Sequence, residues 1–409
     1  MSLPLDGLRV LDLSRLLPGG FCSLMLTDFG ADVIKVEDTG PGDYVRWAPP
    51  FYEGAEQTAR SALFLALNRG KRSIRLDLKS PSGVEVLRRL ARDADVLLES
   101  FRPGVLDRLG VGYEQLRADN PGLVYCAITG YGQNGPNTAR SGHDLNYLGL
   151  NGLLGLSGEA DGPPAQSAGQ IADIGGGALM AVIGILVALR ERERSGEGQL
   201  VDCSMFDGAL SWLAMVAAQG FASGFPRRGD LQLGGALTCY RPYRCADGYV
   251  TLGALEPKFW NAFCLGVGRD DLLGGAFDPP GSDTHRAVSE IFLSRTRAEW
   301  REFASGRDCC LEPVLELDEA LDSGLVRARD MVAALAQPGV EEPVKLVGVP
   351  IKLSRTPGDP TRGPGPALGE HTDEILREAG FGPDEIGALH DASAVAGPTG
   401  TAQGTFMSA

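Results

Sequence analysis

Residues 8–37 read LRVLDLSRLLPGGFCSLMLTDFGADVIKVE, and this stretch decides the fold class. It opens with a short apolar run at 8–13, and a second such run closes it at 31–37. The residues between the two runs have a helical pattern that stops near Gly30. A strand, a helix and a strand in this order predict a βαβ unit, in which the two strands are parallel.

The same alternation of strands and helices continues along the chain. Further strand candidates at 95–100 and 122–130 are set among helical patterns, and QLVDCSM is another. We therefore predict an α/β protein with a Rossmann-like large domain built on a parallel sheet. Ligands of such sheets bind at the carboxyl ends of the strands. The loops in which to expect a site are those after Leu13, Glu37, Ser100 and Thr129.

The middle of the chain has a different pattern. The segment YRPYRCADGYVTLG predicts a hairpin around Asp247 and Gly248, and helical patterns follow it. We predict a large domain over 1–224 and a smaller α+β domain over 225–333. The remainder, 334–409, is Pro/Gly-rich and extended at first, and its small, polar end from Ala392 is expected to be a flexible tail.

Composition narrows the classes of function. The 409 residues include 38 basic and 53 acidic ones, a net charge of −15, which argues against binding to nucleic acid or to an anionic membrane. The eight cysteines form no CxxC pair, so no metal site is expected. No basic segment followed by a long apolar one opens the sequence, and the apolar run at 178–189 is shorter than the roughly 20 residues of a membrane span. We expect a cytoplasmic protein.

Basic residues gather in the segment NRGKRSIRLDLKS. It holds Arg69, Lys71, Arg72, Arg75 and Lys79. Such a cluster is either a solvated charged face or a phosphate site, in which Arg makes planar two-point contacts and Lys supplies a point charge. The segment alone leaves both interpretations open. Arg102, in SFRPGVLDRLG, follows a predicted strand end, and this position favours the phosphate site.

His143 is one of four histidines, and it lies in RSGHDLNYLGLNG after a glycine-rich loop. A lone histidine is more often structural than catalytic. Three features favour an acid–base role: the strand-end loop before it, the helical pattern after it, and the acidic neighbour Asp144. The N-terminus of a helix favours the neutral imidazole that a general base needs near neutral pH.

Asp173 and Glu256 are two further candidates. Asp173 lies where the N-cap of a long apolar helix belongs. The three glycines at 175–177 are poor helix formers, so we expect another group to approach the backbone closely there. Glu256, in GALEPKF, follows a predicted strand and precedes Pro257, which by itself is typical of a surface turn residue.

Several motifs together resemble the family III CoA-transferases and, within them, the α-methylacyl-CoA racemases. The motifs are PLDGLRVLDLSRLLPGGFCSLMLTDFGADVIKVE, GKRSIRLDLKSPSG, LLESFRPGVLDRLG, GYGQNGP, GHDLNYLGLNGLL, IADIGGGALMAVIGILVAL, RSGEGQLVDCSM and GALEPKF. They extend from about Leu5 to about Leu389. The racemases look like GHDxNY at the first catalytic position, and residues 142–147 match that pattern.

The resemblance implies a two-base isomerisation of a 2-methylacyl-CoA, a reaction of fatty acid metabolism. His143 and Asp173 would flank the α-carbon, and Glu256 would hydrogen-bond to His143 and tune it. The implied CoA-binding residues are Lys35, Arg72, Leu76, Asp77, Leu78, Lys79, Arg102, Gly142, Asp144, Leu145, Asn146 and Tyr147. The resemblance implies no metal and no cofactor beyond the CoA moiety of the substrate.

The resemblance also implies an interlaced homodimer. The segment 334–409 would return to complete the large, CoA-binding domain, and each active site would lie between the large domain of one chain and the small domain of the other. Glu256 would then reach His143 across the dimer.

The alternative is a CoA transferase, in which Asp173 attacks a thioester to form an acyl anhydride. Transferase chemistry does not require His143, whereas the insert at 46–68 is longer than in compact racemases and resembles the transferases. Racemases also carry a basic residue where this chain has Asp38, for which Lys35 or Arg46 could substitute.

Overall fold

The computed structural model describes residues 2–398 and 404–406. The chain divides into two compact units. The first unit consists of Met1–Asn151, Gly169–Trp212 and Gly324–Ala409, and the second of Gly152–Ala168 and Leu213–Ser323. The expected domain borders at 224 and 333 stay a prediction about which parts fold independently.

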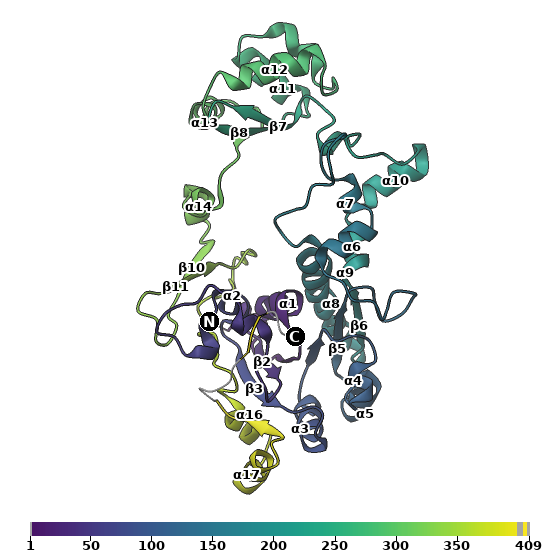
Figure 1. The fold of residues 1–409 in the computed structure, drawn as a ribbon, viewed down its shortest axis with the longest axis vertical. Coiled ribbons are helices and arrows are strands. Elements are labelled where there is room, and N and C mark those ends of the chain that lie inside the picture. The colour runs from purple at the N-terminus through teal and green to yellow at the C-terminus, as the bar shows by residue number, and fades with distance from the viewer. Residues whose placement is uncertain (1, 399–403, 407–409) are drawn as a thin grey trace. The chain divides into compact units, whose positions relative to one another are not determined.

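The first unit is built on a mainly parallel sheet, as residues 8–37 predict (Figure 1). Its strands lie in the order β12-β3-β2-β1-β4-β5-β6, and among the described residues only β12 runs antiparallel to its neighbour. The strands are β1 (Arg9–Asp12), β2 (Asp32–Glu37), β3 (Arg72–Leu76), β4 (Val96–Glu99), β5 (Val124–Thr129), β6 (Leu200–Ser204) and β12 (Val395–Ala396). The order from β3 to β6 is that of the doubly wound Rossmann fold, so the predicted fold class is confirmed. In this fold the ligand site lies where the strand order reverses, between β1 and β4.

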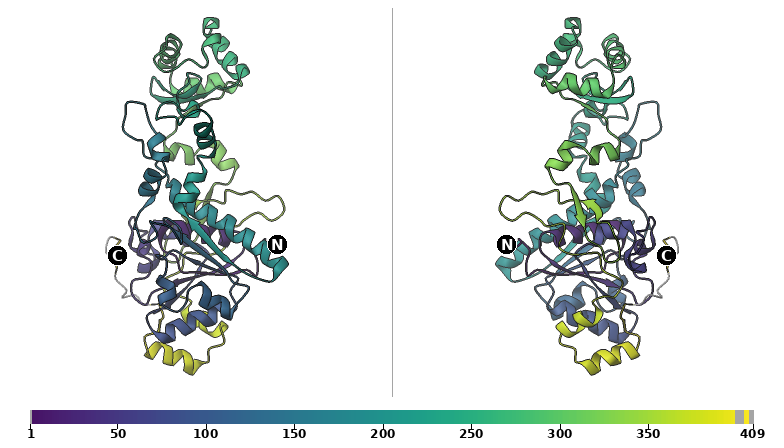
Figure 2. Two further views of the ribbon diagram at one scale, coloured as in Figure 1. Left: turned by 90° about the vertical axis from the view of Figure 1, so that its right-hand side faces the viewer. Right: turned by 90° about the vertical axis from the view of Figure 1, so that its left-hand side faces the viewer.

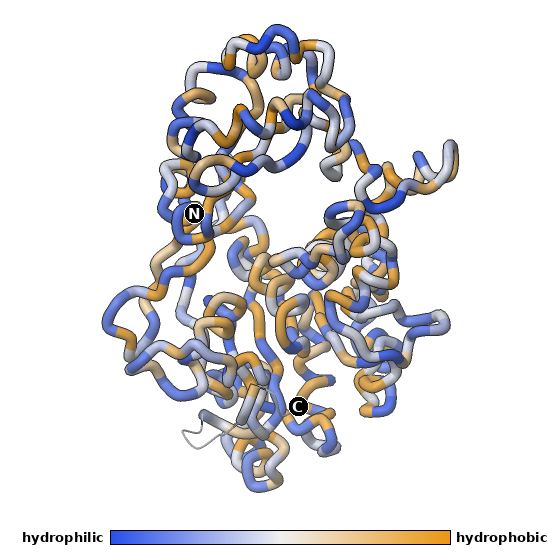
Figure 3. The backbone as a smooth tube through the Cα atoms, turned by 45° about the horizontal axis from the view of Figure 1, so that its top comes forward, coloured by the Kyte–Doolittle hydropathy of each residue, from blue (hydrophilic) through white to orange (hydrophobic). Residues whose placement is uncertain are grey.

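Helices cover both faces of this sheet (Figures 1 and 2). On one face, α1 (Leu16–Asp28) packs against β1 and β2, and α8 (Leu179–Ser195) packs against β5 and β6. The helices of the other face are α3 (Pro81–Arg92), α5 (Tyr113–Asp119), α16 (Thr372–Glu378) and α17 (Pro383–Asp391). Figure 3 shows apolar and polar residues interleaved along much of the chain, the pattern of elements with one buried side. The other elements of this unit are η1 (Tyr44–Trp47), η2 (Gln57–Ala59), α2 (Ala62–Asn68), α4 (Val105–Arg108), α6 (Asp144–Leu150), η3 (Ile171–Ala178), α9 (Met205–Ser211), α15 (Gly324–Ala328), β10 (Val332–Leu335) and β11 (Val344–Val347).

Two strands of the seven-stranded sheet were not predicted from the sequence. β3 lies inside the basic segment NRGKRSIRLDLKS, where alternation of charged residues with Ile74 and Leu76 marks a strand with one side in the core. β12 pairs with β3 through Val395 and Ala396, so the expectation of a flexible tail from Ala392 is wrong for residues 392–398. The rest of that tail, apart from 404–406, lies outside the described residues.

The apolar run at 178–189 belongs to a longer helical segment, Ile171–Ser195. Among the described residues this segment is long and apolar enough to cross a membrane by length and composition, so the expectation that it is too short is wrong. Its most apolar window is half buried inside the protein, against β5, β6 and α1. A core helix of this kind passes the same test of length and composition.

The second unit has its own core around a small antiparallel sheet. The predicted hairpin is present as β7 (Tyr240–Cys245) and β8 (Gly248–Gly253), and β9 (Leu311–Pro313) pairs with β8. Trp260 and Trp300 are buried in this core. The helices of this unit are α7 (Leu153–Leu156), α10 (Ala214–Ser223), η4 (Gln232–Gly234), α11 (Pro257–Gly266), η5 (Asp270–Gly275), α12 (Asp283–Leu293), α13 (Arg297–Ser305) and α14 (Leu317–Leu321).

Candidate active site

Two adjoining cavities open at the carboxyl ends of the strands of the first unit. The first has a volume of about 440 Å³ and the second about 350 Å³. Leu13, Arg15 and Phe101 line both of them, and these residues follow β1 and β4. The cavities therefore lie at the point where the strand order reverses, as the fold predicts for a ligand site.

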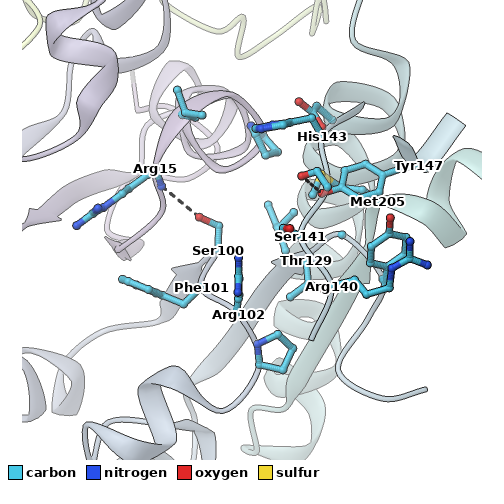
Figure 4. A pocket seen from close by; sticks show the side chains of 18 of the residues that line it. Arg15, Ser100, Phe101, Arg102, Thr129, Arg140, Ser141, His143, Tyr147 and Met205 are labelled. Carbon is cyan, nitrogen blue, oxygen red and sulfur yellow. Dashed lines mark hydrogen bonds between the residues drawn. The ribbon is translucent and has the colours of Figure 1, made fainter. Parts of the chain in front are cut away.

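The first cavity is lined by many polar side chains (Figure 4). Those with charged or titratable groups are Arg15, Tyr44, Arg102, Tyr131, Arg140, His143, Tyr147 and Asp173. Arg15 is held at the rim by its backbone N–H, which donates to Ser100 Oγ at 3.2 Å. Arg140 and Tyr44 were not singled out as site residues from the sequence. Arg140 follows the glycine-rich loop that leads to His143, and this placement was the available signal.

His143 stands immediately before α6, at the end of the glycine-rich loop that follows β5. Its backbone N–H donates to Asn146 Oδ1 at 3.0 Å, which fixes the chain at the start of the helix. The side chain is exposed and lines the first cavity. The predicted position of this histidine, at a loop end where a helix begins, is confirmed.

Asp173 is not an N-cap, contrary to the first interpretation. It lies within η3, a π-helical segment that begins at Ile171 and continues into α8. π-helical turns are uncommon and occur often at functional sites. The side chain of Asp173 lines the same cavity as His143, so the structure brings the two predicted acid–base residues together.

The three glycines after Asp173 allow a second helix to approach. A Cβ atom on Gly175 would lie 2.2 Å from Trp212 Cζ2, and one on Gly176 would lie 2.6 Å from the carbonyl oxygen of Met205. The expected close approach to this backbone is therefore present, and the groups that approach it belong to α9 and to Trp212, which follows α9.

Burial and the nearby carboxylate of Asp144 raise the pKa of Asp173 to about 6, although His143 acts in the opposite direction. An acid with a pKa near the working pH exists in both of its forms, so it can both accept and donate a proton. Asp173 therefore has the electrostatic character of an acid–base residue, and this supports the interpretation made from its position.

Asp144 and Tyr147 hold this arrangement in place. Asp144 Oδ1 accepts hydrogen bonds from the backbone N–H groups of Ala172 at 2.7 Å and Asp173 at 3.1 Å. The hydroxyl of Tyr147 donates to the carbonyl oxygen of Gly142 at 2.6 Å. The first turn of α6 thus fixes the residue before His143 and the backbone of Asp173 together.

The second cavity contains the predicted CoA-binding run after β3. Leu76, Asp77, Leu78 and Lys79 line it, together with Asp38 and Arg108. Arg102 lines the first cavity instead, whereas Arg15 reaches both. Arg108 was missed, although it lies in the same predicted strand-end segment as Arg102, SFRPGVLDRLG.

Two basic residues that were predicted to bind CoA, Lys35 and Arg72, do not line these cavities. Lys35 has no exposed surface, and its Nζ pairs with Asp43 Oδ2 at 2.9 Å. Arg72 opens β3 at its amino end, away from the cavity edge, and pairs with Asp32 at 2.7 Å. Arg46, considered as a substitute for the basic residue of racemases, is also fully buried and pairs with Glu37 at 2.6 Å.

The remaining predicted residues fall in different surroundings. Gly142 lines the first cavity beside His143, whereas Leu145 is exposed and Asn146 serves the start of α6. Glu256 belongs to the second unit, where it is exposed at the start of α11. Among the described residues, no group of three or more His, Cys, Asp or Glu side chains could hold a metal ion.

A comparison with known protein families identifies the family of this chain. The model of the family described as CoA-transferase family III matches residues 5–372. The chain belongs to this family.

Its relatives in the family include enzymes of two kinds. The chain is similar to an alpha-methylacyl-CoA racemase of Mus musculus, with 40% identity over 94% of this chain and 96% of that protein. It is also similar to a succinyl-CoA:mesaconate CoA-transferase of Haloarcula hispanica, with 36% identity over 92% of this chain and 97% of that protein. The crystal structure of a CAIB/BAIF family protein from Brucella suis matches with a TM-score of 0.80 and 33% identity, over 93% of this chain and all of that one. The protein is therefore a family III CoA-transferase or racemase.

Proposed function

We propose that the protein is a racemase of 2-methylacyl-CoA thioesters, with His143 and Asp173 as its acid–base pair. The observation that carries the proposal is that both side chains line one cavity at the switch point of the sheet. His143 immediately precedes α6 and Asp173 lies in η3, and Asp144 connects these two helices. Of the relatives named above, the racemase has the higher identity.

The proposed reaction moves one proton off the α-carbon and one proton back onto it. The base, either His143 or Asp173 according to the enantiomer, takes the α-proton, and the C–H electron pair becomes the C=C bond of an enolate. The protonated partner then donates its proton to the opposite face of that carbon. The N–H groups in the first turn of α6 are suited to stabilise the enolate oxygen, an effect worth roughly 3–4 kcal/mol per donor in known cases.

The CoA moiety is proposed to occupy the second cavity. Lys79 and Arg108 line it, and Arg15 stands at the junction with the first cavity. Cationic side chains at these places are suited to the phosphates of CoA, while Leu76 and Leu78 offer apolar contacts to the adenine ring. The thioester would then enter the first cavity past Arg15 and Phe101. The reaction requires no cofactor beyond the CoA of the substrate, because each step is a proton transfer.

An interlaced homodimer is part of the proposal. In it, Glu256 of the partner subunit would accept a hydrogen bond from the imidazole of His143 and tune its basicity. Exposed apolar side chains in each unit support a partner of some kind: Ile183 and Val187 on α8 are 53% and 63% exposed, and Met215 and Phe221 on α10 are 79% and 81% exposed. Large exposed apolar surfaces of this kind mark interaction sites.

CoA transfer is the second candidate, and the similarity to the Haloarcula transferase favours it. In that reaction a carboxylate oxygen of Asp173 would attack the thioester carbon and release the CoA thiolate, leaving a mixed anhydride on Asp173. The CoA thiolate would then attack the carbonyl carbon of Asp173 and release the donor acid, which leaves an Asp173–CoA thioester. The acceptor acid would displace the thiolate to form a second anhydride, and attack of the thiolate on the acceptor acyl carbon would give the new thioester and restore the Asp173 carboxylate. His143 would have no required role.

One experiment separates the two functions. The protein is incubated in deuterium oxide with (S)-2-methylacyl-CoA and no acceptor acid. Deuterium at the α-carbon together with loss of optical purity is the result expected of a racemase. Absence of exchange, with CoA transfer once a free carboxylic acid is added, would refute the racemase and establish the transferase. His143→Ala should abolish the exchange while CoA affinity stays nearly unchanged.

A further inference from the structure

A buried ion pair lies beneath the loop that separates β1 from α1. Lys35 Nζ and Asp43 Oδ2 are 2.9 Å apart, and their side chains are 0% and 1% exposed. Both groups also bind the backbone of that loop. Lys35 Nζ donates to the carbonyl oxygen of Ser14 at 3.1 Å, and the Asp43 carboxylate accepts from the N–H of Leu16 at 3.2 and 3.3 Å.

The residue between these two anchor points is Arg15. Leu16 adopts a φ of 58°, a left-handed conformation that a leucine rarely takes and that needs support from its surroundings. The pair supplies this support, because it holds the carbonyl oxygen before Arg15 and the N–H after it. The bend directs Arg15 to the junction of the two cavities.

The same pair also anchors a second segment of the first cavity. Asp43 Oδ1 accepts from the N–H of Val45 at 3.1 Å and so begins η1. Tyr44, the first residue of η1, lines the cavity that contains Asp173. The segment after β1 and the segment after β2 are therefore both held by hydrogen bonds to the same buried pair, Lys35 and Asp43.

The positive charge of Lys35 is stable in this position. Burial alone would lower the pKa of Lys35, but Asp43, Asp12 and Glu37 together reverse this effect and leave the pKa raised. Replacing a buried ion pair by apolar residues of similar size is often neutral or stabilising, so stability alone gives little reason to keep one. A requirement for a specific backbone conformation is a sufficient reason.

We propose that Lys35 and Asp43 are positioning residues, which act on the acyl-CoA through the loop that carries Arg15 and through Tyr44. The inference rests on the proposed function in one respect, namely that Arg15 contacts the CoA part of the substrate. It replaces the direct CoA contact that the sequence suggested for Lys35.

The test is the double replacement K35M/D43L, which removes both charges and leaves no unpaired ion. Its matched control is R69M/D28L, which removes another buried ion pair (2.6 Å, side chains 4% and 6% exposed) that does not contact the loop. Unfolding midpoints establish that both proteins are folded. K35M/D43L should raise KM for the acyl-CoA about tenfold, as expected for loss of one charged contact worth about 1.4 kcal/mol, while the control leaves KM within about twofold.

A cycle with R15A shows whether the effect passes through Arg15. If it does, K35M/D43L adds little to the KM of R15A, because the contact is already lost. Where R15A itself raises KM, full additivity with R15A, or an unchanged KM in a folded K35M/D43L protein, would overturn the inference.

Amide hydrogen exchange gives a readout that does not depend on the proposed function. Peptides covering 13–17 should exchange faster in K35M/D43L than in the control, including at Arg15, whose N–H is bound to Ser100. Unchanged protection of Arg15 would overturn the positioning role. A silent R15A together with faster exchange would support that role and would instead refute Arg15 as a CoA contact.

Discussion

Asp144 connects the two halves of the catalytic pair, so its loss should affect rate and stability together. Its Oδ1 accepts from the backbone N–H groups of Ala172 and Asp173 at 2.7 and 3.1 Å. Asp144→Ala removes the acceptor and the negative charge, and it leaves two N–H groups at the start of η3 without their partner. Asp144→Asn keeps an oxygen at the same place but removes the charge.

The expected magnitude follows from the two hydrogen bonds. A hydrogen bond to a charged group contributes about 1.5–3 kcal/mol, and both are partly buried, so Asp144→Ala should lower the free energy of unfolding by about 2–4 kcal/mol. Asp144→Asn should lower it by about 1 kcal/mol. Displacement of Asp173 by about 1 Å should slow α-proton exchange about 100-fold in the alanine variant.

The assay follows α-deuterium exchange against pH, beside denaturant unfolding of each variant. Because Asp144 raises the pKa of Asp173, the pH midpoint assigned to Asp173 should move to lower pH in both variants. Asp247→Ala is the matched control, since Asp247 also binds a backbone N–H, that of Arg297 at 2.7 Å, but in the second unit. An Asp144→Ala protein with wild-type exchange rate and pH profile would refute the connection between α6 and Asp173.

Three further predictions concern single residues. Arg108→Ala should raise KM for the acyl-CoA about tenfold with little change in kcat, whereas Arg327→Ala on α15, which does not line the second cavity, should leave steady-state kinetics unchanged. Asp173→Asn should abolish exchange, and it should stabilise the fold by about 1–3 kcal/mol at pH 8. The reason is that the raised pKa of Asp173 makes protonation of this carboxyl stabilise the folded state; this contribution is fully present below pH 3.8 and is lost as the pH rises through about 6. Equal unfolding midpoints of the variant and wild type at pH 8 would contradict this. Trp300→Ala should lower the stability of the second unit by about 3–5 kcal/mol, since the side chain is fully buried and its Nε1–H is bound to the carbonyl oxygen of Phe292; a loss under 1 kcal/mol in urea unfolding would contradict the packing described.

Local patterns were sufficient for five of the seven strands of the sheet and for the place of the candidate site. The β-branched runs around the first helix gave the parallel strands, and strand ends gave the loops that line both cavities. His143 was found because a rare side chain stood between a glycine-rich loop and a helix. The strand β3 was missed because its charged residues attracted a functional interpretation, although Ile74 and Leu76 alternate with them.

Arg72 and Lys35, which were predicted to bind CoA but do not line the cavities, show what sequence patterns leave undetermined. Arg72 could have been placed correctly once β3 was recognised, because the first residue of a parallel strand lies at the edge opposite the ligand site. Lys35 could not have been placed in this way, because nothing in DVIKVE shows that the side chains on both faces of this strand are buried. Its partner Asp43 comes from the next loop, and only tertiary folding brings the two into contact.

Racemase and transferase chemistry place different demands on the same carboxyl group. A nucleophile must be ionised, and with a pKa of about 6 Asp173 is mostly ionised at pH 7 and available for attack on a thioester. A two-base racemase also needs the protonated form for one of its two directions, and a pKa of about 6 still leaves a useful fraction protonated near neutral pH. Asp173 therefore satisfies both reactions. His143 is therefore the residue that distinguishes the racemase from the transferase, because only the two-base proton transfer requires a second titratable group in the same cavity.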